Sequence, residues 1–382
     1  MDTTGLMALK DIFCQDKAVE ILQHAYASGR MAHAYLFSGD DGVGKRTTAR
    51  AWAKMLLCEN KRIISQNPYF ADSCGQCHSC RTFEGGGHPD FQMITKELIQ
   101  FTRESKNKTT PIKMPIDVIR EFLIEKIANR PMMGQYVVYV IDEAEKVNRE
   151  SQNALLKTLE EPPKYCVIIL LCSQLDEMLP TTRSRCQLVR FGPVSEERII
   201  QRLCSGGVSK TEAVFWSRFS QGSIGQALAW SQLQIDDDAG LFAVKKELIE
   251  KIASLNLPDV LDIADWLSQN TKKIAAAWNS ISKNVSISDI TRRVEKGLIQ
   301  MAVFALNDAM KLASGFSSSD LVNEDQLDSI HKLADKYDAE TAAKQVEICY
   351  RLLNWVDSSV NEKLIYEQLL FNIANSDIMY SL

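Results

Sequence analysis

Proline is almost missing from the second half of this sequence. Of the ten prolines in 382 residues, nine lie at or before Pro193, and only Pro258 follows. Because proline breaks helices, the second half can form long ones. A run of about 18 apolar residues is also missing, which excludes a membrane-spanning helix. The N-terminus lacks a basic stretch followed by an apolar core, so we expect no secretory signal.

The sequence also has no excess of positive charge. Lysine and arginine number 44 against 49 aspartates and glutamates, which gives a formal net charge of −5. Any contact with nucleic acid must then come from a local basic surface. We expect a cytoplasmic protein, and in that reducing compartment its ten cysteines serve as thiols or metal ligands, not as disulfides. The length predicts two or three domains.

Strands alternate with helices in the first half of the sequence. Short apolar runs of strand length occupy residues 33–39, 135–142, 165–173 and 186–191. Helical patterns fall between them at residues 45–58, 116–130 and 148–161. Apolar strands that alternate with helices predict an α/β fold, with a parallel sheet between two layers of helices.

The pattern changes near residue 193. Short helical segments separated by glycines extend to residue 238, and long amphipathic stretches follow over residues 239–382. We therefore divide the chain into an α/β core over residues 1–192, a small helical segment over residues 193–238 and an all-α domain over residues 239–382.

The segment FSGDDGVGKRTTA, residues 37–49, has the spacing of a phosphate-binding loop (P-loop). It follows a predicted strand and opens a predicted helix, so its N–H groups and the helix dipole point toward an anion. Gly39, Gly42 and Gly44 allow close approach of phosphates, and Lys45 can reach the outer ones. An ordinary strand–helix turn is the alternative interpretation.

The position after this lysine departs from the pattern. A serine or threonine hydroxyl there would bind Mg²⁺, but the residue is Arg46. Successive helical residues differ by about 100° in direction, so Thr47 cannot take over that position. We expect weak or metal-poor binding of ATP and little hydrolysis.

Two carboxylates follow the second predicted strand. Asp142 and Glu143 come directly after the apolar run VVYVI, at the sheet edge where open α/β sheets bind their ligands. The aspartate would orient Mg²⁺, and the glutamate would polarise a water molecule as a general base. An exposed acidic turn is the simpler alternative, which the presence of the P-loop weakens.

Two arginines, Arg183 and Arg185, lie in a turn that follows a predicted strand. An arginine can stabilise the charge of phosphoryl transfer on a neighbouring subunit. Taken alone, an arginine-rich turn is more often a solvated or ion-paired surface.

Four cysteines have the spacing of a metal site. Cys58, Cys74, Cys77 and Cys80 form the pattern C-x15-C-x2-C-x2-C, an insertion over residues 58–80. Four thiolates make a closed tetrahedral zinc site, which is structural and not catalytic. Replacement of one ligand by His78 and a chance grouping are the alternatives. The remaining cysteines are predicted to be buried core thiols.

Together these segments resemble the clamp-loader subunits of bacterial DNA polymerase III. The resemblance rests on GDDGVGK, the cysteine pattern, GHPDF (87–91), VIDEAEKVNRESQNALLKTLEEPP and RSRC, and covers roughly residues 8–230. It implies an AAA+ core, with residues 193–238 as a helical lid and residues 239–382 as a collar that joins a five-subunit ring. The implied partners are gamma/tau and delta subunits, with the sliding clamp and primed DNA reached through the complex.

Two subunit types of this family fit the sequence. The gamma/tau motor carries GKT or GKS in its loop and an arginine in a GSLRDAL-like lid segment, where this chain has Arg46 and, in GSIGQAL, Gly225. Both departures favour the delta-prime type, for which the resemblance implies little ATPase activity. It further implies that Arg185 completes the ATP site of an adjacent gamma subunit, and that Ser173 lies near the position of a polar sensor. A zinc-dependent DNA-binding module unrelated to replication is the alternative from another class.

Overall fold

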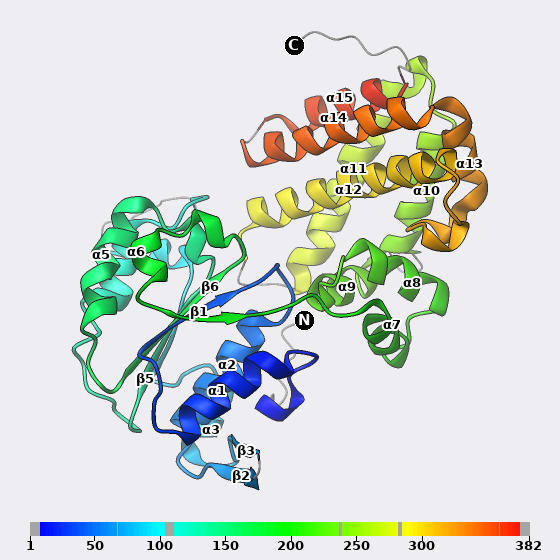
Figure 1. Cartoon of the computed structure of the whole chain (residues 1–382). Helices are drawn as coiled ribbons and strands as arrows, with labels where there is room; N and C mark the ends of the chain where they lie inside the picture. The colour runs from blue at the N-terminus through cyan, green and yellow to red at the C-terminus, as the bar shows by residue number, and fades with distance from the viewer. Residues whose placement is uncertain are drawn as a thin grey trace. The chain divides into compact units, whose positions relative to one another are not determined.

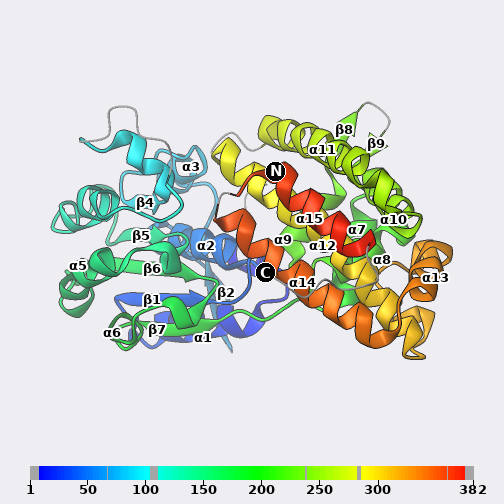
Figure 2. The same ribbon diagram turned by 90° about the horizontal axis from the view of Figure 1, so that it is seen from above.

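The computed structural model describes residues 8–66, 68–103, 111–236, 239–281, 285–358 and 360–374. The chain divides into two compact units. The α/β unit consists of residues 2–194 with residues 223–225, and the helical unit of residues 195–222 with residues 226–382 (Figures 1 and 2). The division of the second half into lid and collar stays a prediction, and its boundary at residue 238 lies outside the described residues.

The α/β unit is built on one parallel sheet. Its five strands are β1 (Ala34–Ser38), β4 (Phe91–Ile94), β5 (Val137–Ile141), β6 (Cys166–Cys172) and β7 (Gln187–Arg190), in the spatial order β4-β5-β6-β1-β7. All four neighbouring pairs are parallel. The carboxyl ends of these strands therefore meet at one edge of the sheet, which is the edge that carries the candidate site.

Helices cover both faces of this sheet. On one face, Tyr35 and Phe37 of β1 share a core with Trp52, and on the other Leu36 shares a core with Leu155. The first face is covered by α1 (Asp16–Ala27) and α2 (Lys45–Leu57), and the second by α4 (Ile116–Ile119) and α5 (Arg149–Glu160). Shorter helices are η1 (Leu9–Asp11), α3 (His78–Glu84), η2 (Lys96–Phe101), η3 (Arg120–Ile124), η4 (Ala144–Lys146), η5 (Leu175–Glu177) and α6 (Pro180–Arg183).

The predicted fold class is confirmed, but several elements of this unit differ from the prediction. The helix expected over residues 116–130 ends as a π-helical segment at Ile124. Beyond it the chain continues in turns, in which the carbonyl oxygen of Lys126 accepts from the N–H of Asn129 and from the hydroxyl of Tyr139. Strand β4 and the antiparallel hairpin of β2 (Arg62–Gln66) and β3 (Tyr69–Asp72) were not predicted.

The other unit is helical, as predicted. The five long amphipathic stretches form α10 (Leu241–Ala253), α11 (Val260–Ile281), α12 (Ile287–Ala313), α14 (Ala339–Asp357) and α15 (Glu362–Ala374). The further elements are α7 (Glu196–Ser205), α8 (Lys210–Phe219), α9 (Ile224–Ser231), β8 (Gln234–Asp236), β9 (Ala239–Gly240), η6 (Leu257–Asp259), η7 (Ser318–Asp320), η8 (Glu324–Gln326) and α13 (Leu327–Lys336). In the described part of the chain, no helix has the length and apolar character needed to cross a bilayer.

An aromatic core joins the early and late helices of this unit. The ring centroids of Trp216 and Trp230 lie 6.3 Å apart, and Phe219 packs against Phe304 of α12 at 5.7 Å. A Cβ at Gly297 of α12 would lie 2.0 Å from the Trp230 ring. Glycine is therefore required at this position, because any side chain would displace the indole.

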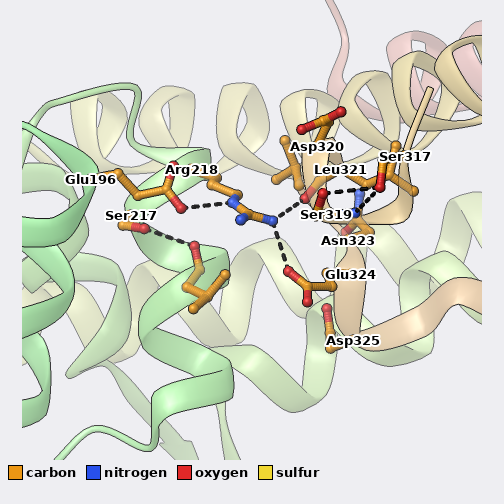
Figure 3. A network of polar contacts seen from close by, with 12 residues as sticks. Glu196, Ser217, Arg218, Ser317, Ser319, Asp320, Leu321, Asn323, Glu324 and Asp325 are labelled. Carbon is orange, nitrogen blue, oxygen red and sulfur yellow. Dashed lines mark hydrogen bonds and ion pairs between the residues drawn. The ribbon is translucent and has the colours of Figure 1, made fainter.

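A polar network centred on Arg218 ties the same helices together (Figure 3). Its Nε donates to Glu196 of α7 at 2.8 Å, and its Nη1 donates to the carbonyl oxygen of Leu321 at 2.5 Å and to Glu324 at 3.0 Å. One guanidinium thus holds α8 to α7 and to the segment that precedes α13.

A buried ion pair lies near this network. Nζ of Lys245 is 2.6 Å from Asp325, and the two side chains are 0% and 5% exposed. Burial lowers the pKa of Lys245 to about 8, although Asp325 opposes the change. The amino group also lies 4.2 Å from the ring centroid of Phe215, so α8, α10 and η8 meet around one charge.

Substitution of Arg218 by methionine is expected to lower the free energy of unfolding by about 1–3 kcal/mol, because the hydrogen bonds of a charged group are lost. Urea unfolding followed by tryptophan fluorescence would measure the change. Arg198→Met, on an exposed position of α7, is the matched control. Equal stability of the two variants would contradict a structural role for the network.

Candidate functional site

The P-loop joins β1 to α2. At Gly39 a Cβ would lie 2.4 Å from the carbonyl oxygen of Phe191, so glycine alone fits beside the chain that follows β7. Gly42 and Gly44 have φ angles of 78° and 110°, a conformation that favours glycine. The three glycines let the chain turn tightly from the strand into the helix.

The amino group of Lys45 is bonded within its own loop. Nζ donates to the carbonyl oxygens of Gly39 at 2.5 Å and of Asp40 at 2.8 Å, and it lies 3.6 Å from a carboxylate oxygen of Asp41. The residue is 7% exposed. A phosphate group would have to compete with these oxygens for the lysine.

Arg46 faces the first carboxylate of the predicted pair. Its Nη1 lies 3.5 Å from Oδ2 of Asp142, which directly follows β5. Burial raises the pKa of Asp142, and the positive charge of Arg46 opposes that rise. A Mg²⁺ ion at this carboxylate would lie beside a fixed positive charge. Thr47, the next residue of α2, is half-buried.

The second carboxylate, Glu143, is held by two lysines. Nζ of Lys146 bonds to one of its oxygens, and Nζ of the buried Lys96 lies 3.5 Å from the other. The Glu143 backbone is left-handed, with φ of 48°, which is uncommon for a residue other than glycine. Since both oxygens have cationic neighbours, this glutamate is poorly suited to act as a general base.

Ser173 follows β6 at the same edge of the sheet. Its hydroxyl bonds to Oε1 of Glu145, and the other oxygen of that glutamate is buried without a partner in the described structure. Cys172, one residue earlier, is 0% exposed, and burial raises the pKa of its thiol to about 12. Cys172 is therefore a core residue, and Ser173 supplies the polar group at this edge.

The segment Ser223–Gly225 is seated on the P-loop and belongs to the same compact unit. The N–H of Gly225 donates to the carbonyl oxygen of Gly42 at 2.9 Å, and the Ser223 hydroxyl donates to that of Asp41 at 2.6 Å. A Cβ at residue 225 would lie 3.0 Å from Cα and the carbonyl oxygen of Gly42. An arginine could not occupy this position without a shift of the backbone.

Arg185 lies just after α6 and is paired within its own chain. Its Nε donates to Oε1 of Glu160 at 2.8 Å, its Nη2 contacts the same oxygen, and its Nη1 donates to the carbonyl oxygen of Thr181 at 2.8 Å. The Arg185 and Glu160 side chains are 32% and 47% exposed. Arg183 lies 3.9 Å from the fully exposed Asp176. The structure thus leaves Arg185 at the surface, with an internal partner.

The four predicted metal ligands are brought together. Cys58 follows α2, Cys74 follows β3, and Cys77 and Cys80 lie at the start of α3, with all four sulfur atoms within 4.8 Å of one another. The Sγ atoms of Cys58 and Cys77 are 3.9 Å apart, as are those of Cys74 and Cys80. Zinc–sulfur bonds of about 2.3 Å require sulfur atoms about 3.8 Å apart in a tetrahedron, so the cage fits zinc. His78 is not part of this cluster.

Backbone N–H groups point at these sulfur atoms. Cys58 accepts from the N–H of Cys74 at 3.3 Å, and Cys74 accepts from those of Gln76 at 3.4 Å and Cys77 at 3.3 Å. Burial acts to raise the pKa of Cys74, but these donors and the neighbouring thiols outweigh it and lower the pKa to about 6. Burial raises the pKa of Cys80. The donors favour the thiolate form that a metal requires.

The GHPDF segment is structural. His88 Nδ1 accepts from the N–H of Asp90 at 3.1 Å, so its Nε2 is the donor toward Ser79 Oγ, 2.9 Å away. The Ser79 hydroxyl in turn donates to the carbonyl oxygen of Leu57. Because His88 Nε2 carries the proton in its contact with Ser79, it cannot accept the serine proton as a base, and Ser79 is not an activated nucleophile. The carboxylate of Asp90 accepts the N–H groups of Met132 and Met133, in the segment before β5, both at 2.7 Å.

The sequence pattern did not identify several residues that contact the predicted ones. They are Lys96, Glu145, Lys146 and Glu160. Each partners a motif residue, but surface lysines and glutamates are common, and no spacing rule sets these four apart. Glu145, Lys146 and Glu160 lie within the segment VIDEAEKVNRESQNALLKTLEEPP on which the resemblance rests, whereas Lys96 lies outside every quoted motif.

Two family models match the chain. One, described as DNA polymerase III, delta subunit, matches residues 14–195, and the other, described as its C-terminal part, matches residues 285–375. They cover most of the α/β unit and the last helices of the helical unit.

Curated relatives and solved structures include subunits of the same polymerase. DNA polymerase III subunit gamma of Buchnera aphidicola is 28% identical over 90% of this chain and 88% of its own length. Subunit delta' of Pseudomonas aeruginosa is 37% identical over 41% of this chain and 42% of its own length. A gamma subunit-related protein of Thermotoga maritima, a solved structure, covers 92% of this chain and 98% of its own, with a TM-score of 0.43 and 14% identity.

Proposed function

Since the chain belongs to the DNA polymerase III clamp-loader family, we propose that it is a delta-prime-like subunit that helps to load the sliding clamp onto primed DNA. It would act in the bacterial cytoplasm, in a ring with gamma/tau and delta subunits. In this role the chain hydrolyses little or no ATP itself and contributes Arg185 to the ATP site of a neighbouring subunit.

One observation carries the proposal: Arg46 faces Asp142 at 3.5 Å. In a hydrolysing P-loop the aspartate and a serine or threonine hydroxyl hold Mg²⁺. Here the hydroxyl is absent from that position, and a guanidinium supplies the positive charge that neutralises the carboxylate. A second cation at Asp142 is disfavoured by repulsion between like charges.

Two further features support the same conclusion. The would-be general base, Glu143, is flanked by Lys96 and Lys146. The position that would carry a lid arginine in a motor is Gly225, and it lies against the P-loop backbone. Metal binding, the general base and the lid arginine are thus each compromised at a different residue.

The isolated chain is expected to show no steady-state ATP hydrolysis above background, because neither the metal nor the base is available in the required form. Lys45→Ala should leave that background unchanged. Phosphate release measured at saturating Mg²⁺ and ATP checks both statements. Robust turnover that disappears in Lys45→Ala would support the gamma/tau motor instead.

That motor is the second candidate function. It is favoured by the Buchnera gamma subunit, which aligns with 90% of this chain, whereas the Pseudomonas delta' subunit aligns with 41%. The cysteine cluster suits either subunit type, so the ATPase measurement is needed to distinguish them. Family membership gives no support to a zinc-dependent DNA-binding module unrelated to replication.

We also propose that Cys58, Cys74, Cys77 and Cys80 hold one structural Zn²⁺. Two pairs of the four sulfur atoms are already 3.9 Å apart, all four lie within 4.8 Å of one another, and backbone N–H groups donate to the sulfur atoms of Cys58 and Cys74. Zinc would supply no catalysis here, because four protein ligands leave no open coordination position. The ion would fix the β2–β3 hairpin and α3 to the end of α2.

A further inference from the structure

The guanidinium of Arg185 is clamped on one edge and open on another. A guanidinium has five N–H donors in a planar fork. Glu160 Oε1 receives the N–H of Nε and one N–H of Nη2, and the carbonyl oxygen of Thr181 receives one N–H of Nη1. Nη1 also makes a longer contact of 3.5 Å with the hydroxyl oxygen of Ser184, and one N–H of Nη2 remains beyond these contacts. If the long Ser184 contact is given up, each terminal nitrogen can contribute one N–H to a bidentate contact with a phosphate.

Both ends of this clamp are anchored in the core. Glu160 is the last residue of α5 and follows Leu159, which is 0% exposed. Arg185 follows α6, whose Thr182 is also 0% exposed, and its N–H donates to the Thr182 carbonyl oxygen. The carboxylate and the arginine backbone are therefore held at a fixed separation by buried neighbours.

The two glutamates of the LEEPP segment differ in whether they contact Arg185. Glu160 contacts Arg185, whereas no contact of the exposed Glu161 side chain is found in the described part of the chain. The segment thus offers a matched pair of adjacent carboxylates, only one of which touches the arginine.

We propose that Glu160 is a positioning residue for Arg185, whose Nε edge it holds so that the terminal nitrogens can contact a phosphate. The proposal rests on the trans role of Arg185 given above. A free arginine loses much rotamer entropy when it binds a phosphate, and prior ordering by Glu160 lowers that cost. The ligand is the triphosphate end of a nucleotide bound to a neighbouring subunit.

The test uses the clamp loader reconstituted with gamma and delta subunits. Glu160→Ala is expected to lower kcat at the site bordering this chain by about three- to tenfold, with assembly unchanged, because the arginine is less well aligned. Glu160→Gln, whose amide oxygen still accepts a hydrogen bond, should lie between it and the unaltered chain. Glu161→Ala is the control and should have no effect.

A double substitution separates this inference from the function on which it rests. If Glu160 acts through Arg185, Glu160→Ala adds no loss to Arg185→Ala. If Arg185→Ala has no effect on the ATPase, the proposed function itself is overturned. If Arg185→Ala has a large effect and Glu160→Ala has none, only the positioning role is overturned. A rise in ATPase in Glu160→Ala would overturn it as well, because Glu160 would then be a restraint that the arginine must leave.

The isolated chain provides a readout that is independent of any partner. Nuclear magnetic resonance of the arginine Nε–H groups should show Arg185 protected from solvent exchange, and Glu160→Gln should reduce that protection severalfold. Equal exchange in the two proteins would contradict the clamp directly.

Discussion

Replacing Arg185 with alanine is expected to lower ATP hydrolysis at the adjoining site of a reconstituted clamp loader by about three orders of magnitude. An arginine supplied from a neighbouring subunit is worth about 10³–10⁵ in kcat, since it stabilises charge that develops on the transferred phosphoryl group. The residue reaches the surface in a turn after α6, where its pair with Glu160 is partly exposed. Such partly exposed pairs contribute about 0–1 kcal/mol, so the pair with Glu160 does not prevent Arg185 from contacting a phosphate as well.

The measurement is steady-state ATPase of the assembled ring, with a motor subunit that hydrolyses ATP only at the site next to this chain. Assembly is scored in parallel by size-exclusion chromatography. Arg183→Ala is the control, since that arginine lies two residues away and faces only an exposed aspartate at 3.9 Å. A ring that assembles and retains full activity with Arg185→Ala would refute the trans role.

Removal of one cysteine of the cluster is expected to have the largest effect on stability. We expect about one zinc ion per chain, and its loss in Cys74→Ser. Structural zinc contributes about 10–16 kcal/mol to the folding of zinc-finger peptides. The cluster here borders an established core, so we expect a smaller loss, of several kcal/mol, concentrated in the β2–β3 hairpin and α3.

Metal analysis by mass spectrometry and thermal unfolding together test this expectation. Cys204→Ser is the matched control, because Cys204 is an exposed thiol outside the cluster. It should retain both the metal and the melting temperature. If the unaltered chain, purified without chelators, contains no zinc, the proposed metal site is refuted and the four cysteines are reduced thiols.

The sequence predicted the elements whose apolar pattern is continuous. Strands β5 and β6 lie in the interior of the sheet and are buried throughout, so their runs of valine, isoleucine and leucine identify them. Strand β4 lies at the sheet edge, and three of its four residues are only half-buried, so it carries no comparable run. Strand β2 of the hairpin is mostly exposed and β3 has only four residues, so neither carries a continuous apolar run.

The sequence predicted only those residues of the candidate site that belong to a recognisable motif. Spacing located Lys45, Arg46 and Asp142, because a P-loop and a strand-end carboxylate have fixed positions relative to their own elements. The partners of Glu143 and Arg185 come from elsewhere in the sequence: Lys96, which contacts Glu143, follows β4, and Glu160, which contacts Arg185, ends α5. Contacts of this kind depend on the order of strands in the sheet, which a single sequence does not display.

The contact between Gly225 and Gly42 limits what a single substitution can change at this site. Replacement of Arg46 by threonine would supply one hydroxyl, but the loop carbonyl would still be bonded to the N–H of Gly225, and two lysines would still flank Glu143. No single codon change alters all of these at once. An engineered gain of hydrolysis would therefore require several substitutions made together.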